Sequence, residues 1–197
     1  MDVLDRVKIY TSVGDVDLNN PILYKKDRVN FLEWDMFWLS ETMQPHSVGW
    51  DAKYERYCTW AKFEDNATRK IFYIFNTHLD HKGKNAQREG AALVARQAKL
   101  IAGTYPIIIT GDMNSAYLSD AYLNYVDSYY DSYEVAAQKL GPIGTAHNFG
   151  AVSPVRIDYI FVDEQVKVKK YVVIDEAYEG GFYPSDHFAV YSDIVFE

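Results

Sequence analysis

The sequence predicts an α/β fold that is rich in strands and poor in helices. Its composition, with 48% hydrophobic and 24% charged residues, is that of a folded globular protein. Short segments of aromatic and β-branched residues recur along the chain and alternate with polar turns, as half-buried strands do. One long segment, residues 85–102, instead carries apolar residues at helical spacing. At 197 residues the chain is expected to form a single domain, 1–197.

The first half of the chain is expected to form mostly strands joined by polar loops. Glu41–Tyr54 contains Pro45, Gly49 and several polar residues, so we expect a loop there. The two apolar segments that follow are separated by the polar turn 64–68 and are expected to pair. The strands expected in this half are Val7–Tyr10, Pro21–Lys25, Val29–Trp34, Cys58–Phe63 and Ile71–Thr77.

The second half contains the clearest helix. Asn85–Ala102 carries an apolar stripe at helical spacing, and Gly103 follows as a residue suited to end a helix. Ser119–Val126 is expected to be a short helix. Pro106–Thr110 is a continuous apolar run, typical of a strand buried on both faces. Further strands are expected at Arg156–Val162, Val166–Ile174 and Phe188–Val195.

The composition excludes several classes of protein. Lys and Arg total 20 and Asp and Glu total 28, so the net charge is 20 − 28 = −8, which disfavours binding nucleic acid by charge alone. Carboxylates that hold a divalent cation can still create local positive charge in an acidic protein. The single cysteine, Cys58, excludes an internal disulfide framework, and its strand-like context is typical of a buried thiol. No apolar run is long enough to span a bilayer.

Four short polar segments stand out, and each lies at an end of an expected strand. Polar side chains at strand ends can converge on one rim of a sheet, where functional sites are commonly built. The four segments are Asn76-Thr77-His78-Leu79-Asp80-His81, Gly111-Asp112-Met113-Asn114, Arg156-Ile157-Asp158-Tyr159 and Ser185-Asp186-His187.

The pair Asp112 and Asn114 has two interpretations. On an extended backbone, residues two apart point to the same side, so the carboxylate and the carboxamide would face one point. The carboxylate would then orient or deprotonate a water, and the amide would hold the nucleophile or a phosphate oxygen. Gly-Asp-x-Asn is also a good turn sequence, and taken alone it is more often only a turn.

The histidines in these segments also have both a structural and a functional interpretation. Asp158 is a candidate to orient His187, because a carboxylate held at an imidazole fixes its tautomer. Taken singly, a solvated turn for Asp186 and a structural role for His78 or His187 are the more frequent outcomes. The occurrence of all four segments in this order favours a functional site.

In this combination the sequence resembles the endonuclease/exonuclease/phosphatase superfamily, the metal-dependent phosphodiesterases and phosphatases related to deoxyribonuclease I and exonuclease III. The resemblance extends over nearly the whole chain from about Asn20 and is strongest toward bacterial members. It implies a deoxyribonuclease I-like four-layer α/β sandwich, with two mixed sheets face to face and helices outside. The matching text is Asn-Thr-His-Leu at 76–79, Gly-Asp-Met-Asn at 111–114, Arg-Ile-Asp-Tyr-Ile-Phe at 156–161 and Ser-Asp-His at 185–187.

The resemblance also implies a role for each matching residue. His78 would contact the scissile phosphate. Asp112 would position or activate the attacking water, and Asn114 would help to hold the nucleophile and the phosphate. Asp158 would orient His187, the catalytic histidine near the end of the chain.

The same resemblance implies a metal ion, usually Mg²⁺ or Mn²⁺, held by oxygen ligands. Asp112 and Asp186 are the residues that it places at the metal. The implied chemistry is in-line attack of water on phosphorus, with the metal and the histidines stabilising the developing charge. The implied function is therefore that of a Mg²⁺-dependent hydrolase, either a nuclease or a phosphatase.

One departure from the family pattern is expected to matter. Family members begin with a strand that carries an asparagine, and a metal-binding glutamate follows before the region equivalent to Asn20-Pro21. This chain has too few residues there, and Glu33 and Glu41 come too late. We therefore expect a domain without its N-terminal strands, and weak or absent hydrolysis by residues 1–197 alone. Robust Mg²⁺-dependent turnover of bis-p-nitrophenyl phosphate, lost in His187→Ala and Asp112→Ala, would contradict this expectation.

Three interpretations of the departure stay open. The chain is a truncated form or has a misassigned gene start, or it is a natural fragment completed by another chain or by self-association, or it is an inert relative or phosphate-binding module. Unpaired sheet edges would favour pairing with another copy. Met1–Asp5 has no basic stretch and no apolar signal core, but an upstream native start would leave the localisation open.

A different enzyme class competes for the first polar segment. Residues 76–81 nearly match the His-x-His-x-Asp-His zinc motif of metallo-β-lactamase-like hydrolases, but position 76 is Asn. Five histidines in total make a two-zinc site hard to fill, so this interpretation ranks well below the phosphoesterase one. The zinc content of the purified protein would discriminate the two.

For the phosphoesterase, the charge of −8 favours a phosphodiester or phosphomonoester of modest size over long duplex DNA.

Overall fold

The computed structural model of the protein describes residues 10–13, 20–178 and 180–197. Its helices are α2 (Lys84–Ala102), α3 (Asp120–Val126) and α4 (Ser132–Val135). Its strands are β1 (Tyr10–Val13), β2 (Ile22–Lys25), β3 (Val29–Trp38), β4 (Tyr57–Asp65), β5 (Ile71–His78), β6 (Ile107–Asp112), β7 (Tyr130–Asp131), β8 (Gln138–Leu140), β9 (Asp158–Val162), β10 (Val166–Ile174) and β11 (Ala189–Phe196).

A six-stranded mixed sheet forms the larger half of the fold. Its strand order is β3-β4-β5-β6-β9-β7. The expected pairing of β4 with β5 across a polar turn is confirmed and is antiparallel. β5 and β6 run parallel, joined by the crossover helix α2, and β9 returns antiparallel beside β6. Because β5 and β6 are parallel, their carboxyl ends lie at the same edge of the sheet, next to the amino end of β9.

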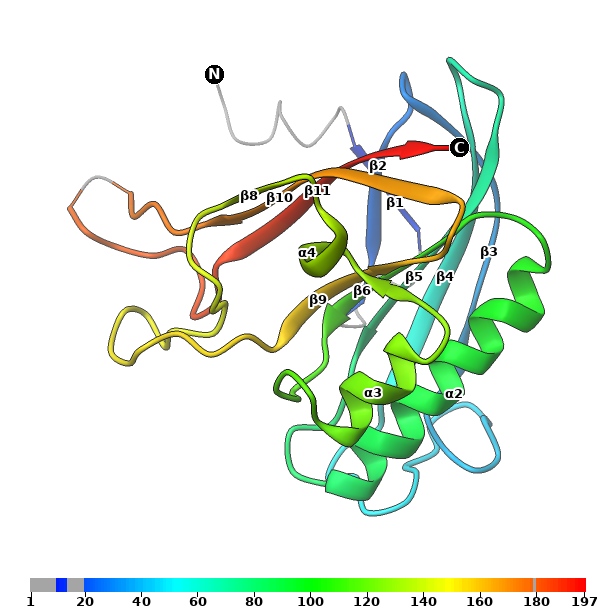
Figure 1. The fold of residues 1–197 in the computed structure, drawn as a ribbon. Coiled ribbons are helices and arrows are strands. Elements are labelled where there is room, and N and C mark those ends of the chain that lie inside the picture. The colour runs from blue at the N-terminus through cyan, green and yellow to red at the C-terminus, as the bar shows by residue number, and fades with distance from the viewer. Residues whose placement is uncertain (1–9, 14–19, 179) are drawn as a thin grey trace.

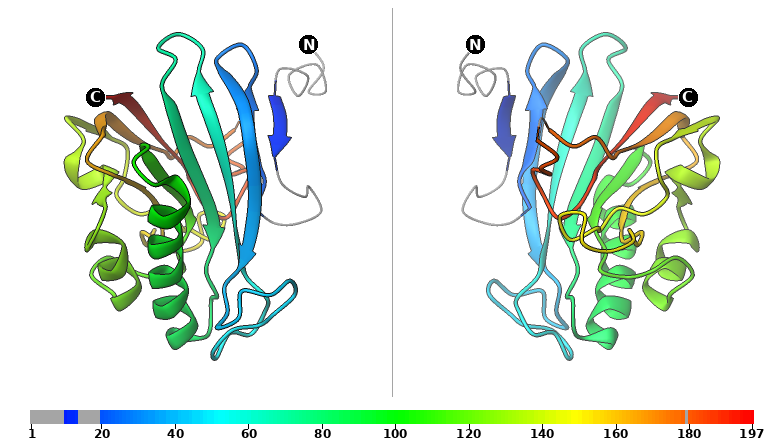
Figure 2. Two further views of the ribbon diagram at one scale, coloured as in Figure 1. Left: turned by 90° about the vertical axis from the view of Figure 1, so that its right-hand side faces the viewer. Right: turned by 90° about the vertical axis from the view of Figure 1, so that its left-hand side faces the viewer.

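The second sheet has three strands in the order β11-β10-β8 and is also mixed, since β10 pairs antiparallel with β11 and parallel with β8. The two sheets face each other, and β1 and β2 form a separate pair beside the larger sheet (Figures 1 and 2). The α/β fold with two mixed sheets and helices is therefore confirmed. The apolar residues between the sheets include Phe63, Phe72, Ile108, Val162, Val166 and Val168.

The helices α2 and α3 lie together against the outer face of the larger sheet (Figure 2). The stripe predicted for α2 is confirmed, since Ala91, Val94, Ala95, Ala98 and Ala102 are all buried in the core beneath it. Gly103 ends the helix with a positive φ of 63°, as expected. Among the helices of the described residues, none is long and apolar enough to cross a membrane.

The structure also adjusts the predicted boundaries. β3 runs to Trp38, four residues beyond the expected end, because its later residues remain paired with β4. β9 begins at Asp158, since Arg156 and Ile157 are not part of the ladder. The short elements β7, α4 and β8 were not expected, because segments of two to four residues carry little periodicity. Most of the expected strand Val7–Tyr10 lies outside the described residues.

Gly111 is required where β6 approaches β5. It has a φ of 147°, and a Cβ there would lie 1.8 Å from the carbonyl oxygen of Thr77. No side chain fits at this distance, so the two parallel strands can come together only around a glycine. The close approach brings the residue that follows, Asp112, beside the end of β5.

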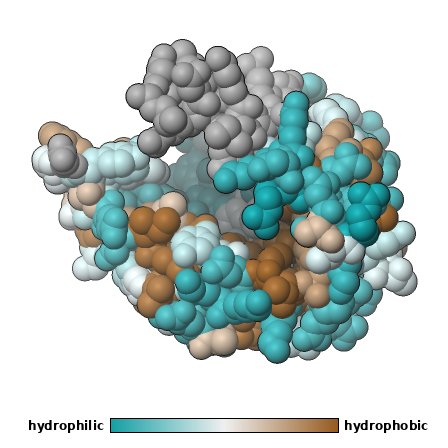
Figure 3. Space-filling view, turned by 90° about the horizontal axis from the view of Figure 1, so that it is seen from above, coloured by the Kyte–Doolittle hydropathy of each residue, from teal (hydrophilic) through white to brown (hydrophobic). Residues whose placement is uncertain are grey.

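The described residues do not fully cover the inner face of the larger sheet beside β2. A cavity of about 430 Å³ opens over the inner face of β4 and β5 and is lined mainly by apolar side chains, among them Tyr24, Phe63, Phe72 and Ile74. Seen from above, the molecule is hollowed near its centre, and hydrophobic surface borders the hollow (Figure 3). The described residues therefore leave part of the apolar inner face of the larger sheet uncovered.

Candidate functional site

Three polar side chains stand next to one another across three neighbouring strands. His78 at the end of β5 pairs in register with Asp112 at the end of β6, and Asp112 pairs with Asp158 at the start of β9. His78 Nε2 lies 3.3 Å from Asp112 Oδ2. The topology alone explains this row, because two strands end and a third begins at the same sheet edge.

His187 reaches the same edge from the second sheet. It lies just before β11, and its Nδ1 is 2.9 Å from Asp158 Oδ2. Since an ionised carboxylate only accepts hydrogen bonds, we assign the proton to Nδ1, which leaves Nε2 for another partner. The expected Asp158–His187 pair is thus formed, and it joins the two sheets at the site.

Asp112 and Asn114 are brought together by a turn rather than by an extended strand. The chain leaves β6 at Asp112, and Asn114 has a positive φ of 46°. The backbone N–H of Asn114 donates to Asp112 Oδ1 at 2.8 Å, and its side-chain amide donates to the carbonyl of Leu79 at 2.9 Å. The argument from extended backbone was therefore wrong at this position, and the turn chemistry of Gly-Asp-x-Asn prevailed. The turn fixes the Asp112 carboxylate while its Oδ2 faces His78.

Asp112, Asp158 and His187 form a group whose ligand atoms all lie within 4.8 Å of one another. Burial raises the pKa of the Asp158 carboxyl above its ordinary value, and the charge of Asp112 adds to this. The side chains of Thr145 and His187 act in the opposite direction by hydrogen bonding and charge. Two carboxylates at this separation repel each other, and a bound cation or a protonated histidine would relieve that repulsion.

Asp186 is placed differently from the other predicted residues. Its carboxylate is exposed and accepts a hydrogen bond from the Ser185 hydroxyl at 3.4 Å, and it is not part of the group formed by Asp112, Asp158 and His187. Its backbone carbonyl instead holds the neighbouring loop, because the N–H groups of His147 and Asn148 donate to it at 2.8 and 3.0 Å.

The zinc motif considered for residues 76–81 is not assembled by the fold. Asp80 turns into the protein interior, where it accepts hydrogen bonds from the N–H groups of Lys82 and Gly83 at 2.9 and 2.8 Å. His81 is exposed and stacks on Tyr54, with ring centroids 5.6 Å apart. These two residues shape the loop after β5, while His78 faces Asp112.

The Asp80 contacts predict a pH-dependent contribution to stability. Burial raises the pKa of the Asp80 carboxyl, but backbone N–H donors led by Gly83 and Lys82 outweigh it, so the pKa is lowered. A depressed folded-state pKa stabilises the fold above the unfolded value of about 3.9, and this stability is lost as the pH falls through the folded pKa. We expect Asp80→Asn to lower the free energy of unfolding by about 2 kcal/mol near neutral pH.

Urea unfolding of both proteins across the acid range checks this. The difference between wild type and Asp80→Asn should shrink as the pH falls below about 4. The exposed Asp127, at the C-terminus of α3, provides the control variant Asp127→Asn. A difference between wild type and Asp80→Asn that does not change with pH would contradict the role given to the charge.

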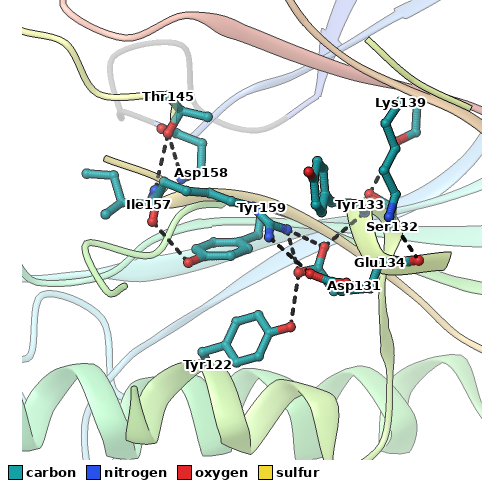
Figure 4. A network of polar contacts seen from close by, with 12 residues as sticks. Tyr122, Asp131, Ser132, Tyr133, Glu134, Lys139, Thr145, Ile157, Asp158 and Tyr159 are labelled. Atoms are coloured by element: carbon teal, nitrogen blue, oxygen red, sulfur yellow. Dashed lines mark hydrogen bonds and ion pairs between the residues drawn. The ribbon is translucent and has the colours of Figure 1, made fainter. Parts of the chain in front are cut away.

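Two features of the site were not predicted from the sequence. Thr145, in the loop between β8 and β9, is fully buried and accepts hydrogen bonds from the N–H groups of Ile157 and Asp158 (Figure 4). Asn76 bridges β6 and the segment before β2, since its amide accepts from Thr110 and donates to the carbonyl of Pro21. A single threonine in a loop carries no pattern that would reveal such a contact.

Comparison with known proteins places this arrangement in a family. The model of the Endonuclease/Exonuclease/phosphatase family matches residues 19–187. The chain belongs to this family. The matched range contains all four polar segments, and no curated protein matches the chain.

Solved structures of the endonuclease/exonuclease/phosphatase family have the same fold. A family protein from Bacteroides vulgatus is 34% identical to this chain with a TM-score of 0.88. The match covers 97% of this chain and 78% of the Bacteroides vulgatus chain. One from Bacteroides thetaiotaomicron is 36% identical with a TM-score of 0.85, covering 90% and 67%. A mannosyl-6-phosphatase from Bacteroides thetaiotaomicron is 32% identical with a TM-score of 0.87, covering 98% and 81%.

Proposed function

We propose that the protein hydrolyses small phosphate esters with the help of a divalent cation, using the row of side chains at the sheet edge. The observation that carries this proposal is the register of His78, Asp112 and Asp158 across β5, β6 and β9, with His187 held on Asp158 at 2.9 Å. Two carboxylates and two imidazoles at one edge supply a base, a charge-stabilising pair and oxygen ligands in the same place.

Each side chain has a task that its contacts support. Asp112, fixed by the turn to Asn114, orients a water for in-line attack and accepts its proton as the new P–O bond forms. The ester P–O bond breaks, and the leaving alkoxide takes a proton from solvent water. His78 lies beside Asp112 and contacts the phosphate. His187, held by Asp158 through Nδ1, presents Nε2 to a phosphoryl oxygen, and in its protonated form it stabilises the charge that develops there.

The donor atoms fit a hard divalent cation such as Mg²⁺ or Mn²⁺. The carboxylates of Asp112 and Asp158 lie close enough for the charge of one to raise the pKa of the other, which is the environment that a cation stabilises. We infer that Asp112 and Asp158 are the carboxylates closest to the ion, while Asp186, the other ligand that the resemblance implied, lies outside their group at the exposed rim. A bound cation would supply charge neutralisation at the phosphate.

The substrate that we favour is a phosphomonoester of modest size. The net charge of −8 opposes a long nucleic acid, whose binding depends on clustered Lys and Arg. Among the similar structures, a mannosyl-6-phosphatase is 32% identical to this chain. A hexose 6-phosphate is therefore the first physiological type of substrate to test, beside simple phosphomonoesters and phosphodiesters.

A substrate panel tests this function. Purified protein is assayed with p-nitrophenyl phosphate, bis-p-nitrophenyl phosphate, mannose 6-phosphate and a single-stranded oligonucleotide, with Mg²⁺, with Mn²⁺ and with EDTA. Because the family's N-terminal glutamate has no match in residues 1–197, we expect only weak, cation-dependent release of phosphate from the monoesters, lost in His187→Ala. Turnover that persists in EDTA, or that is confined to the oligonucleotide, would contradict the proposal.

The alternative of an inert, phosphate-binding domain makes a different prediction in the same panel. Among the described residues, the group that could hold a metal contains two carboxylates and one histidine, which is a sparse ligand set for catalysis. In that case phosphate would bind, as measured by isothermal titration calorimetry in the presence of Mg²⁺, but no ester would be cleaved. Binding without turnover would select this alternative over the hydrolase.

We also propose that the chain self-associates through β11. Among the described residues β11 pairs with β10 alone, so no strand lies along its other edge, where Lys70 Nζ donates to the Phe196 carbonyl at 3.1 Å. Edge strands are commonly protected by proline or lysine, and β11 has neither. Its one charge, Asp193, is engaged by Lys170 at 3.7 Å. Two antiparallel copies of β11 would continue the sheet from one molecule to the next.

Sedimentation across a range of protein concentrations tests this pairing. The wild type should form dimers, and Tyr191→Lys should shift the equilibrium to monomers, because a charge on an edge strand opposes pairing. Lys169→Ala on β10 is the control and should leave the dimer intact. A wild type that stays monomeric at every concentration would contradict the proposal.

A further inference from the structure

The loop before β9 contains a short segment, Thr145–Asn148. This segment lies between the chain that carries Asp158 and the chain that carries His187. On one side it is bridged to Val155, which accepts from the N–H groups of Thr145 and Ala146 at 2.9 Å each. On the other side Ala146 is bridged to His187. The segment therefore joins the chain that leads into β9 with the chain that leads into β11.

Thr145 makes contact with both of these chains. Its side chain is fully buried, and Oγ1 accepts from the N–H groups of Ile157 and Asp158 at 3.2 Å each. Its backbone carbonyl accepts from the N–H of Phe188 at 2.8 Å. Figure 4 shows the hydroxyl next to the backbone nitrogens at the start of β9. One residue thus holds the backbone of Asp158 and the residue next to His187.

His147 and Asn148, the two residues at the end of this segment, make further contacts with the chain that carries His187. The N–H groups of His147 and Asn148 donate to the Asp186 carbonyl, and the His147 ring stacks on Phe188 with centroids 3.8 Å apart. His147 is itself buried, and its Nδ1 accepts from the N–H of Gly150 at 2.9 Å. The segment that carries His187 is therefore held by backbone hydrogen bonds and by a stacked ring.

We propose that Thr145 is a positioning residue that sets the distance between Asp158 and His187. Asp158 is the first residue of β9, so the ladder fixes its backbone from one direction only, and the Thr145 hydroxyl fixes it from the other. Loss of the hydroxyl would leave two partly buried N–H groups without an acceptor, and a shift of the chain would be needed to re-pair them. The 2.9 Å hydrogen bond from His187 Nδ1 to Asp158 depends on that backbone.

The consequence for catalysis rests on the proposed hydrolytic function. A displacement of about 1 Å at a catalytic group can lower a rate by about 10²-fold. We therefore expect Thr145→Val, which keeps the shape and removes the hydroxyl, to lower kcat by about 10²-fold with little change in KM. Thr145→Ser, which keeps the hydroxyl, should retain most of the activity.

The experiment measures the imidazole directly as well as the rate. Proton NMR of histidine-labelled protein detects the Nδ1–H of His187 as a downfield signal, which Asp158→Asn identifies by removing it. The signal should persist in Thr145→Ser and be lost or shifted upfield in Thr145→Val. Thr77→Val is the matched control, because this buried hydroxyl donates to the Tyr57 carbonyl and does not touch Asp158 or His187.

The outcomes separate this inference from the proposed function. A folded Thr145→Val protein with an unchanged Nδ1–H signal overturns the positioning role. If that variant does not fold, Thr145→Ala, which avoids placing a methyl group against the two N–H groups, is measured in the same way. A wild type that shows the signal but hydrolyses no ester counts against the proposed function, and the NMR comparison still decides the role of Thr145.

Discussion

Asp112→Asn is expected to lower the rate of phosphate-ester hydrolysis by about 10³-fold, the usual contribution of a general base. The change keeps the size of the side chain and replaces a carboxylate oxygen by an amide group. An amide can accept the hydrogen bond from the Asn114 N–H that the carboxylate accepts at 2.8 Å, so the turn should remain. What is lost is the negative charge beside His78 and Asp158, and with it the proposed proton acceptor and cation ligand.

Two measurements check this prediction. Steady-state kinetics with p-nitrophenyl phosphate should show the loss in kcat, and Mn²⁺ binding followed by electron paramagnetic resonance should weaken. The second reading does not depend on turnover. Asp127→Asn, which neutralises an exposed carboxylate at the end of α3, is the control and should change neither. Unaltered Mn²⁺ affinity and kcat in Asp112→Asn would remove Asp112 from the proposed mechanism.

Arg156→Met is expected to lower the free energy of unfolding by about 3–5 kcal/mol, the usual result of breaking a buried ion pair. The guanidinium of Arg156 bonds to both carboxylate oxygens of Asp131, and the two side chains are 5% and 0% exposed. Tyr122 donates to the same carboxylate at 3.1 Å, and Figure 4 shows its hydroxyl pointing toward Asp131. The ring centroid of Tyr159 lies 4.6 Å from the guanidinium. Removing the cation leaves Asp131 charged and buried.

A double-variant comparison tests the ion-pair explanation. Asp131→Asn in the Arg156→Met background removes the uncompensated charge, so the double variant should be more stable than Arg156→Met alone. Urea unfolding followed by circular dichroism gives the losses for Arg156→Met, for Asp131→Asn and for the double variant. If the double variant loses the sum of the two single losses, the effect comes from packing around Arg156 instead of from the charge left behind.

The ion pair also shows that one residue of the polar segment 156–159 has a structural role. Arg156 and Asp158 belong to the same polar segment of the sequence, yet they point to different environments. Arg156 packs among tyrosines and bonds to Asp131, whereas Asp158 faces Asp112 and His187. In a regular strand, side chains two residues apart point to the same face. The side chains of Arg156 and Asp158 point to different environments because Arg156 lies before the ladder begins at Asp158.

Most of the regular structure could be predicted because it depends on local patterns. The apolar stripe of α2, the continuous apolar run of β6 and the paired strands β4 and β5 all follow from residue spacing, and the structure confirms them. The short elements β7, α4 and β8 could not be predicted. They exist because the long chain segment before β9 packs across the sheet edge, which is a tertiary effect.

The sequence by itself determined the strand-rich α/β class, the family resemblance and the residues His78, Asp112, Asn114, Asp158, Asp186 and His187 as candidates. Only the tertiary structure decided how they meet. The parallel register of β5 and β6 places His78 beside Asp112, and the antiparallel return of β9 adds Asp158. It also separated Asp80 and Asp186 from this group and brought Thr145 into it. Contacts between residues far apart in the chain depend on strand register and loop packing. The residue spacing within a single segment predicts neither of these.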